Sequence, residues 1–183
     1  MDSITQNHYD ALRSTDKDQQ NSAFFALLAA ADTPVEWAYE VWDELVNLLH
    51  HKDNHLRAIA SQILCNLAKS DPDKRMLKDF DALLAVTRDE RFVTARHCLQ
   101  ALWKVGAAGP EQRETYLNGL VKRFQECVTE KNGTLIRYDI LQSLRNVYDV
   151  VKEDRIKDTA LALIETEEDA KYRKRYAGLW KIK

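Results

Sequence analysis

Three proline residues divide this chain at equal intervals. Pro34, Pro72 and Pro110 stand 38 residues apart, and each follows a small or acidic residue and precedes a charged run. A capping residue followed by proline is typical of a helix start, because the first helical position does not need the N–H that proline lacks. Three helix starts at one spacing predict a helical repeat of about 38 residues.

A second marker recurs at a similar interval. Leucines in similar apolar segments are separated by 39, 35, 42 and 35 residues, at Leu28, Leu67, Leu102, Leu144 and Leu179. Between these markers each unit splits into two stretches whose apolar residues recur every three or four positions, as on one face of a helix. The pattern predicts a single domain over residues 1–183, built from helix pairs at about residues 4–31, 34–70, 72–107, 110–150 and 153–183.

The second unit contains the residues of a known repeat. Asp53 lies in the turn, Arg57 just inside the following helix, Ala60 one turn on, and Leu64 and Leu67 follow. This pattern resembles a HEAT repeat of the armadillo-like α-solenoid family. The resemblance implies an all-α fold, a right-handed α–α superhelix of about five HEAT-like helix pairs.

The later units keep parts of this pattern. The third has Asp89, Ala95 and Leu99 but apolar residues where the family favours arginine, and the fourth has Arg137 but no turn aspartate. The resemblance covers most of residues 33–183. It indicates architecture and says little about function, because such repeats serve many unrelated roles.

Composition excludes several classes of protein. With 5 glycines and 3 prolines in 183 residues, the chain cannot supply the turns of a β-sandwich or β-barrel. The formal net charge of −2 gives no global argument for nucleic-acid binding. The charge is uneven, however, because residues 1–70 contain 5 Lys and Arg against 10 Asp and Glu, and the remainder contains 22 against 19.

The compartment is predicted from targeting signals and cysteines. The first residues have no basic segment followed by an apolar one, and no window of eighteen apolar residues occurs. Cys65, Cys98 and Cys127 lie in apolar-periodic stretches without Cys-x-x-Cys spacing, which predicts buried free thiols in a reducing compartment. We therefore expect a cytoplasmic protein without a membrane span.

No motif indicates catalysis. The chain lacks nucleophile, metalloprotease and phosphate-binding signatures. His50, His51 and His55 are close in sequence, but the helix breaks between them and no further ligand stands at metal spacing. We expect no catalytic residue, metal or cofactor, and no small-molecule substrate is evident.

The most basic segment is residues 171–183, with six basic residues and no acidic one. On a helix, Tyr172, Tyr176 and Leu179 form one stripe. A basic ridge falls beside that stripe, formed by Lys171, Lys174, Arg175 and Lys181. The ridge could bind acidic protein segments, phosphate backbones or an anionic surface. Alternatively, the aromatic stripe docks on the preceding helices and the basic side only caps the array.

The resemblance implies a second candidate surface, because the second helix of each HEAT pair lines a concave face. Arginines lie early in these helices, at Arg57, Arg96, Arg137 and Arg173, where a row of guanidinium groups would suit an extended acidic ligand. Alternatively, each arginine bonds a turn carboxylate such as Asp53, Asp89, Glu168 or Asp169. Trp37 lies off the apolar stripe of its helix and is a possible exposed binding anchor.

These observations favour a non-enzymatic scaffold or adaptor that binds another protein or an acidic macromolecule through the concave face or the basic C-terminal helix. The alternative is a nucleic-acid-binding protein resembling the HEAT-like alkylpurine DNA glycosylases, with Trp103, Arg96, Arg137, Tyr138 and Asp139 in its groove. No residue-by-residue match to that family can be made, and the net charge argues against it. A protein partner is favoured over nucleic acid. HEAT proteins that attach or handle bilin chromophores form a third class, which nothing in the sequence specifically favours.

Overall fold

The computed structural model describes residues 1–181. The chain divides into two compact units, Met1–Cys98 and Leu99–Lys183. Within the described residues the regular structure is helical throughout, with α-helices and two short 3₁₀ turns and without strands. The predicted all-α fold is therefore confirmed. The prediction of one domain over residues 1–183 stays a prediction.

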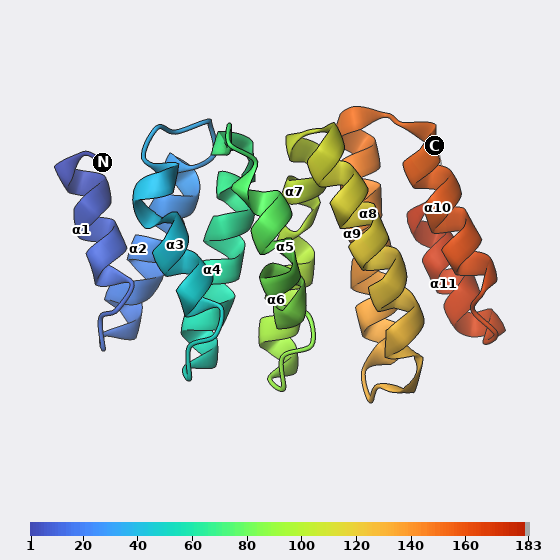
Figure 1. Cartoon of the computed structure of the whole chain (residues 1–183). Helices are drawn as coiled ribbons and strands as arrows, with labels where there is room; N and C mark the ends of the chain where they lie inside the picture. The colour runs from blue at the N-terminus through green and yellow to red at the C-terminus, as the bar shows by residue number, and fades with distance from the viewer. Residues whose placement is uncertain (182–183) are drawn as a thin grey trace. The chain divides into compact units, whose positions relative to one another are not determined.

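Unit 1 consists of antiparallel helix pairs that lie side by side (Figure 1). Its helices are α1 (Ser3–Ala11), α2 (Lys17–Ala30), α3 (Ala38–Leu48), α4 (Asn54–Leu67), α5 (Arg75–Val86) and most of α6 (Phe92–Ala101), with the 3₁₀ turn η1 (Ala68–Ser70) after α4. The boundary with unit 2 falls within α6, after Cys98. Helix α4 contacts both α2 and α5, so successive pairs share one core.

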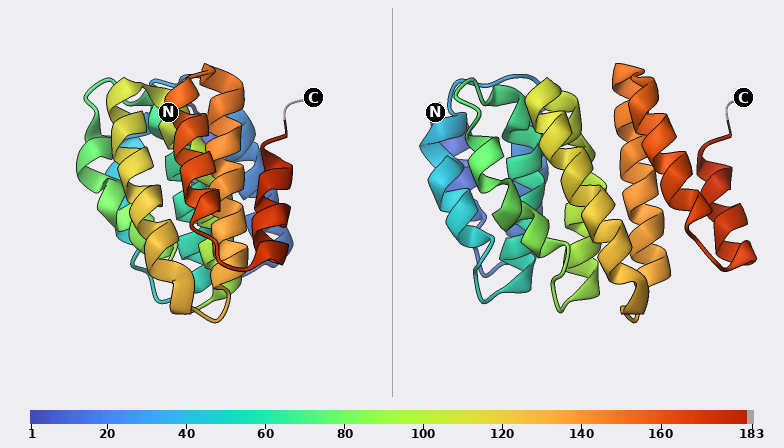
Figure 2. Two further views of the ribbon diagram at one scale, coloured as in Figure 1. Left: turned by 90° about the vertical axis from the view of Figure 1, so that its right-hand side faces the viewer. Right: turned by 45° about the vertical axis from the view of Figure 1, so that its right-hand side comes forward.

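Unit 2 repeats this arrangement (Figure 2). Its helices are α7 (Trp103–Ala108), α8 (Pro110–Glu126), α9 (Gly133–Val151), α10 (Asp154–Glu165) and α11 (Ala170–Leu179), with the 3₁₀ turn η2 (Cys127–Thr129) after α8. Helix α9 contacts α7, α8, α10 and α11 and is the central element of the unit.

Aspartates begin several of these helices. Asp2, Asp16, Asp53 and Asp169 each precede a helix and accept hydrogen bonds from backbone N–H groups of its first turn. These N–H groups have no partner within the helix, so the carboxylate satisfies them and interacts favourably with the helix dipole. The aspartate in the predicted HEAT-like turn is therefore a helix cap.

The prolines mark the repeat but do not all occupy the first helical position. Pro110 does begin α8, as predicted. Pro34 and Pro72 precede their helices by several residues, so for these two the prediction is wrong. The reason is visible before α5, where Asp71 accepts hydrogen bonds from the N–H groups of Arg75 and Met76, both at 2.8 Å. The cap thus acts across a turn that contains the proline.

The apolar stripes meet in a buried core within each unit. In unit 1 the largest fully buried side chains include Trp42 and Phe80, and in unit 2 Tyr116 and Phe124. The three cysteines are buried and free, as predicted. Burial raises the pKa of the Cys98 thiol to about 12, so this group is an inert apolar side chain. Among the described helices, none combines the length and apolar character needed to cross a membrane.

Candidate binding surface

Helix α11 packs against the rest of unit 2 through its aromatic side. Tyr176 is fully buried, and its hydroxyl donates a hydrogen bond of 2.8 Å to the carbonyl of Thr134 at the start of α9. Trp180 is also buried, and Arg145 of α9 donates to the carbonyl of Leu179 at 3.2 Å. Of the predicted aromatic stripe, Tyr176 therefore packs against α9, whereas Tyr172 and Leu179 are half-buried.

The opposite side of α11 is basic and exposed. We call Lys171, Lys174, Arg175 and Lys181 the α11 basic surface. All four side chains are exposed, and within residues 1–181 none of them forms an ion pair with a carboxylate. Positions three and four residues apart share a helix face, which brings the first three together, and Lys181 follows just beyond the helix end. The structure thus leaves uncompensated positive charge here.

One of these cations lies over an aromatic ring of the neighbouring helix. The guanidinium carbon of Arg175 is 4.6 Å from the ring centroid of Tyr138 on α9. Stacking on a ring restricts the arginine while its N–H edges stay available to bind a carboxylate. A pre-oriented guanidinium loses less conformational entropy when it binds than a freely moving lysine does.

A second stacked arginine lies farther along α9. Arg145 has its guanidinium 5.8 Å from the ring of Trp180 and 6.0 Å from that of Tyr148. It also donates a hydrogen bond of 2.9 Å to the carboxylate of Asp149. This bond is the largest cause of a raised pKa of Arg145 and of a lowered pKa of Asp149. Arg145 is therefore already compensated and contributes less free charge than Arg175. Sequence reasoning missed this cluster because its aromatic partner Trp180 is far away in the chain.

The predicted arginine column is occupied by structural bonds. In unit 1, Arg57 donates to both carboxylate oxygens of Asp89, at 2.5 and 2.9 Å, and to the carbonyls of His51 and Lys52. Arg57 therefore forms the bond to a turn carboxylate that the sequence offered as the alternative to ligand binding. Arg96 is half-buried, and its guanidinium lies 5.8 Å from the ring of Phe92.

The arginines of unit 2 are held in the same way. Arg137 is buried, donates to Glu167 at 2.8 Å and to the carbonyl of Phe124 at 3.2 Å. Arg173 donates to the carbonyls of Glu167 and Glu168, at 2.8 and 3.2 Å. Glu167, in the turn between α10 and α11, thus accepts from Arg137 through its carboxylate and from Arg173 through its backbone carbonyl. These guanidinium groups satisfy backbone and carboxylate acceptors of the fold.

Trp37 is not an exposed anchor. It stands at the N-cap position of α3 without a capping hydrogen bond from its side chain, and it is only 8% exposed, so the prediction of an exposed anchor is wrong. Helix α3 begins one residue after Trp37. The helical periodicity that predicted Trp37 to lie off the apolar stripe therefore does not apply to it.

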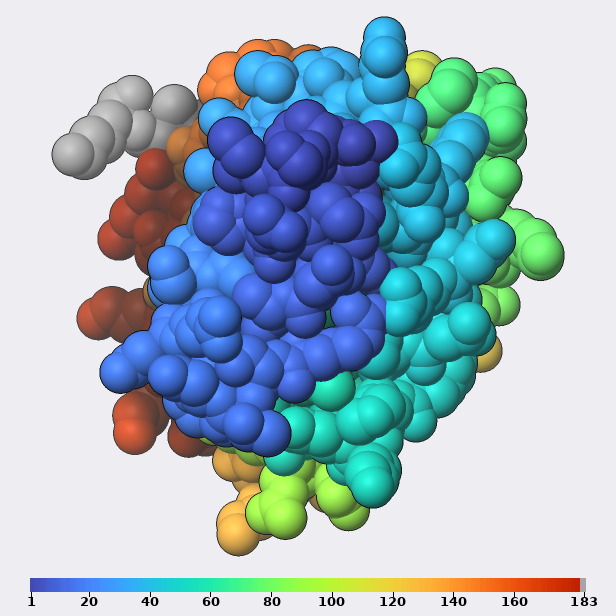
Figure 3. Space-filling model, turned by 90° about the vertical axis from the view of Figure 1, so that its left-hand side faces the viewer, coloured from blue at the N-terminus to red at the C-terminus, as the bar shows by residue number. Residues whose placement is uncertain are grey.

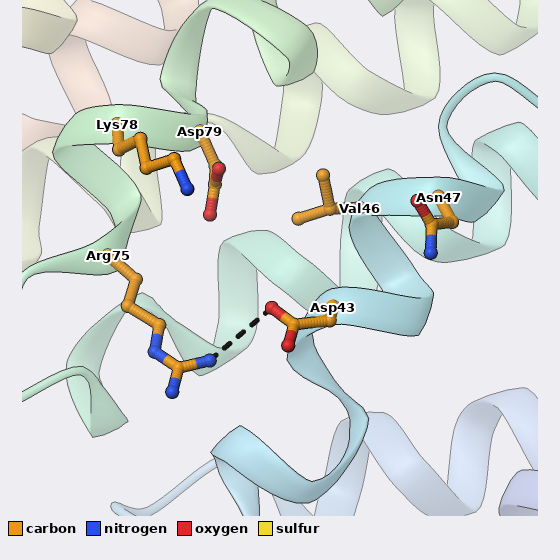
Figure 4. Close-up of a pocket in the computed structure, with 6 residues that line it drawn as sticks. All are labelled: Asp43, Val46, Asn47, Arg75, Lys78 and Asp79. Carbon is orange, nitrogen blue, oxygen red and sulfur yellow. Dashed lines mark hydrogen bonds and ion pairs between the residues drawn. The ribbon is translucent and has the colours of Figure 1, made fainter.

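A separate cavity of about 520 Å³ lies between α3 and α5 in unit 1 (Figure 4). Arg75 and Lys78 reach it from α5, and Asp43 and Asn47 from α3. Arg75 bonds Asp43 at 3.4 Å, and Asp79 accepts a hydrogen bond of 2.9 Å from the indole of Trp42. The charges of this lining largely cancel, so it favours no ligand charge. Over residues 1–181, no group of three or more His, Cys, Asp and Glu side chains is placed to hold a metal ion.

Comparisons with known proteins inform only on the fold of this chain. No model of a known protein family matches the chain, and no curated protein matches it. Several solved structures do match it, and two of them are crystal structures of engineered proteins of the Northeast Structural Genomics Consortium. The first has 19% identity and a TM-score of 0.57 over 96% of this chain and 77% of its own. The second has 18% identity and a TM-score of 0.56 over 98% and 79%.

At these identities the likeness shows architecture and not activity. The chain has a helical repeat fold, and the HEAT assignment stays a resemblance.

Proposed function

We propose that this chain is a non-enzymatic binding module whose α11 basic surface binds an acidic segment of a protein partner. The observation that supports it is the set of four exposed cations without a carboxylate partner among the described residues. By contrast, the exposed Arg155 of α10 forms an ion pair with Glu114 at 2.6 Å. We assign binding to this surface and not to the arginine column, because Arg57 and Arg137 already have buried acceptors.

The ligand chemistry follows from the spacing of the cations. Lysines provide mobile point charges and Arg175 a planar fork on the Tyr138 ring, a combination that suits carboxylates presented along an extended or helical segment. Nucleic acid requires many phosphate contacts, and one helix with four cations provides few.

The test measures binding of a fluorescently labelled glutamate-rich peptide, a glutamine-rich peptide of equal length and a DNA duplex. We expect the glutamate peptide alone to bind, with affinity that falls as salt screens the charges. The double variant Lys174→Glu/Arg175→Glu should weaken binding at least about tenfold, which corresponds to about 1.4 kcal/mol.

The matched control is Lys78→Glu/Lys131→Glu, which makes the same change of net charge at two exposed lysines outside α11. It should bind as the wild type does. Equal weakening by both double variants would show a non-specific effect of net charge and contradict the proposal. Tighter binding of the duplex than of the glutamate peptide would instead favour the nucleic-acid alternative.

A further inference from the structure

Helix α2 of unit 1 exposes an aromatic side chain between two carboxylates. Phe25 is 65% exposed, and Asp18 and Asp32 stand seven residues before and after it. Seven residues are close to two helical turns, so all three lie on one side of α2, with Asp32 just past the helix end. We call Asp18, Phe25, Ala29 and Asp32 the α2 stripe. Helices α1 and α2 form much of the surface that faces the viewer in Figure 3.

The carboxylates of the α2 stripe are available. Neither Asp18 nor Asp32 forms an ion pair within the described chain. Two lysines lie nearby without an ion pair to these carboxylates. Lys17 donates to the side chain of Gln20 at 3.0 Å, and Lys69 donates to the backbone carbonyl of Asp32 at 2.7 Å. The stripe also belongs to the acidic part of the sequence, where carboxylates outnumber cations 10 to 5 over residues 1–70.

The α11 basic surface adjoins a shallow hollow that matches this stripe. The hollow, of about 300 Å³, lies between α10 and α11. Ile164, Ala170 and Ala177 supply its apolar lining, and Arg173, Lys174 and Glu165 its polar lining. Leu161 of α10 adds a further exposed apolar side chain, 38% exposed. An aromatic ring with carboxylates on either side could fill the apolar part and place its charges near the lysines.

We infer that the α2 stripe of one copy docks on the α11 basic surface of a second copy, with Phe25 in the hollow between α10 and α11. The inference rests on the proposed function, because it names a second copy of the chain as the acidic partner. Charge complementarity supports this occupant: the stripe has two free carboxylates, and the surface has four free cations. The two contacting surfaces differ, so the contact is heterologous.

The contact is small and therefore weak. One aromatic side chain and a few exposed charges fall short of the area that a stable dimer needs. We expect the average molecular mass to rise with protein concentration and to fall with added salt, because exposed charges are screened.

The experiment is sedimentation velocity over about two decades of protein concentration, a range in which mass action shifts a weak self-association. Two charge-reversal variants are compared with the wild type, Asp18→Lys/Asp32→Lys and Lys171→Glu/Lys174→Glu. Each alone should be monomeric, because like charges then meet in the contact. Their equimolar mixture should associate again, because each variant then offers the other a surface of opposite charge.

A third variant tests the aromatic contact without a change of charge. Phe25→Ala should raise the apparent dissociation constant about tenfold. Val128→Ala is its control, because Val128 is 59% exposed and lies outside both surfaces. Circular dichroism checks that every variant is folded.

Several outcomes would overturn the inference. A wild type that is monomeric at every concentration, yet binds the glutamate peptide, refutes self-association and leaves the proposed function standing. A monomeric wild type that also fails to bind the peptide refutes both. Self-association unaffected by Asp18→Lys/Asp32→Lys shows that the α2 stripe is not the occupant and likewise refutes the inference.

Discussion

Replacing Asp89 with alanine removes one partner from the best-formed ion pair of unit 1. Arg57 and Asp89 are joined by two hydrogen bonds, at 2.5 and 2.9 Å. Their side chains are only 14% and 4% exposed. Loss of the carboxylate leaves a largely buried guanidinium without its charged partner. The free energy of unfolding should therefore fall.

The magnitude follows from this burial. Breaking a buried pair by removing one partner costs about 3–5 kcal/mol. The lower end applies here, because Arg57 keeps the carbonyls of His51 and Lys52 as acceptors and is partly solvated. At about 1.5 kcal/mol per molar of urea, a loss of about 3 kcal/mol lowers the midpoint of unfolding by about 2 M.

The assay is urea unfolding followed by circular dichroism, with amide hydrogen exchange to locate the loss in unit 1. Glu114→Gln is the control, because it breaks the Arg155–Glu114 pair, whose side chains are 58% and 48% exposed. That midpoint should barely move. A loss of less than about 1 kcal/mol in Asp89→Ala would show that the pair behaves as a surface pair and would refute the reasoning.

The same pair predicts a dependence on pH. Burial alone would raise the pKa of Asp89, but hydrogen bonds from Arg57 and from the backbone of Arg91 outweigh it and lower the pKa. The stabilisation that the Arg57–Asp89 pair provides is therefore complete above the unfolded-state pKa of aspartate, about 3.9. It is lost as the pH falls through the lower pKa of Asp89 in the folded state. The difference in stability between wild type and Asp89→Ala should narrow below about pH 4. A constant difference would contradict the assigned shift.

Two further predictions concern unit 2. A Cβ added at Gly106 would lie 2.7 Å from Tyr116, so Gly106→Ala should lower the free energy of unfolding by about 1–3 kcal/mol. A Cβ added at Gly178 meets nothing within 4 Å, so Gly178→Ala should raise that free energy by about 0.5–1 kcal/mol. Thermal unfolding of both variants checks this contrast. Burial, and then the charge of Glu167, raise the pKa of Tyr176. The free energy of unfolding should therefore fall as the pH rises above the unfolded-state pKa of about 10. Unfolding measured against pH should show a smaller fall at alkaline pH in Tyr176→Phe than in the wild type.

The sequence by itself determined the helical class and the spacing of the pairs. Few glycines and prolines excluded β-folds, and the apolar periodicity predicted two helices in each unit. Aspartates in turns, such as Asp53, became helix caps, and the cysteines became buried thiols. These features depend on local backbone chemistry and on periodicity, which a single sequence displays directly.

Only the tertiary structure decided which charges are free. Arg57 and Arg173 look alike in the sequence, yet one binds a distant carboxylate and the other caps a local turn through backbone carbonyls. Lys174 and Arg175 are exposed, and over residues 1–181 neither forms an ion pair with a carboxylate. Charge compensation depends on residues that folding brings together from 30 or more positions away, as Arg57 with Asp89 and Arg137 with Glu167. Local sequence patterns do not contain those distances, whereas the folded units do.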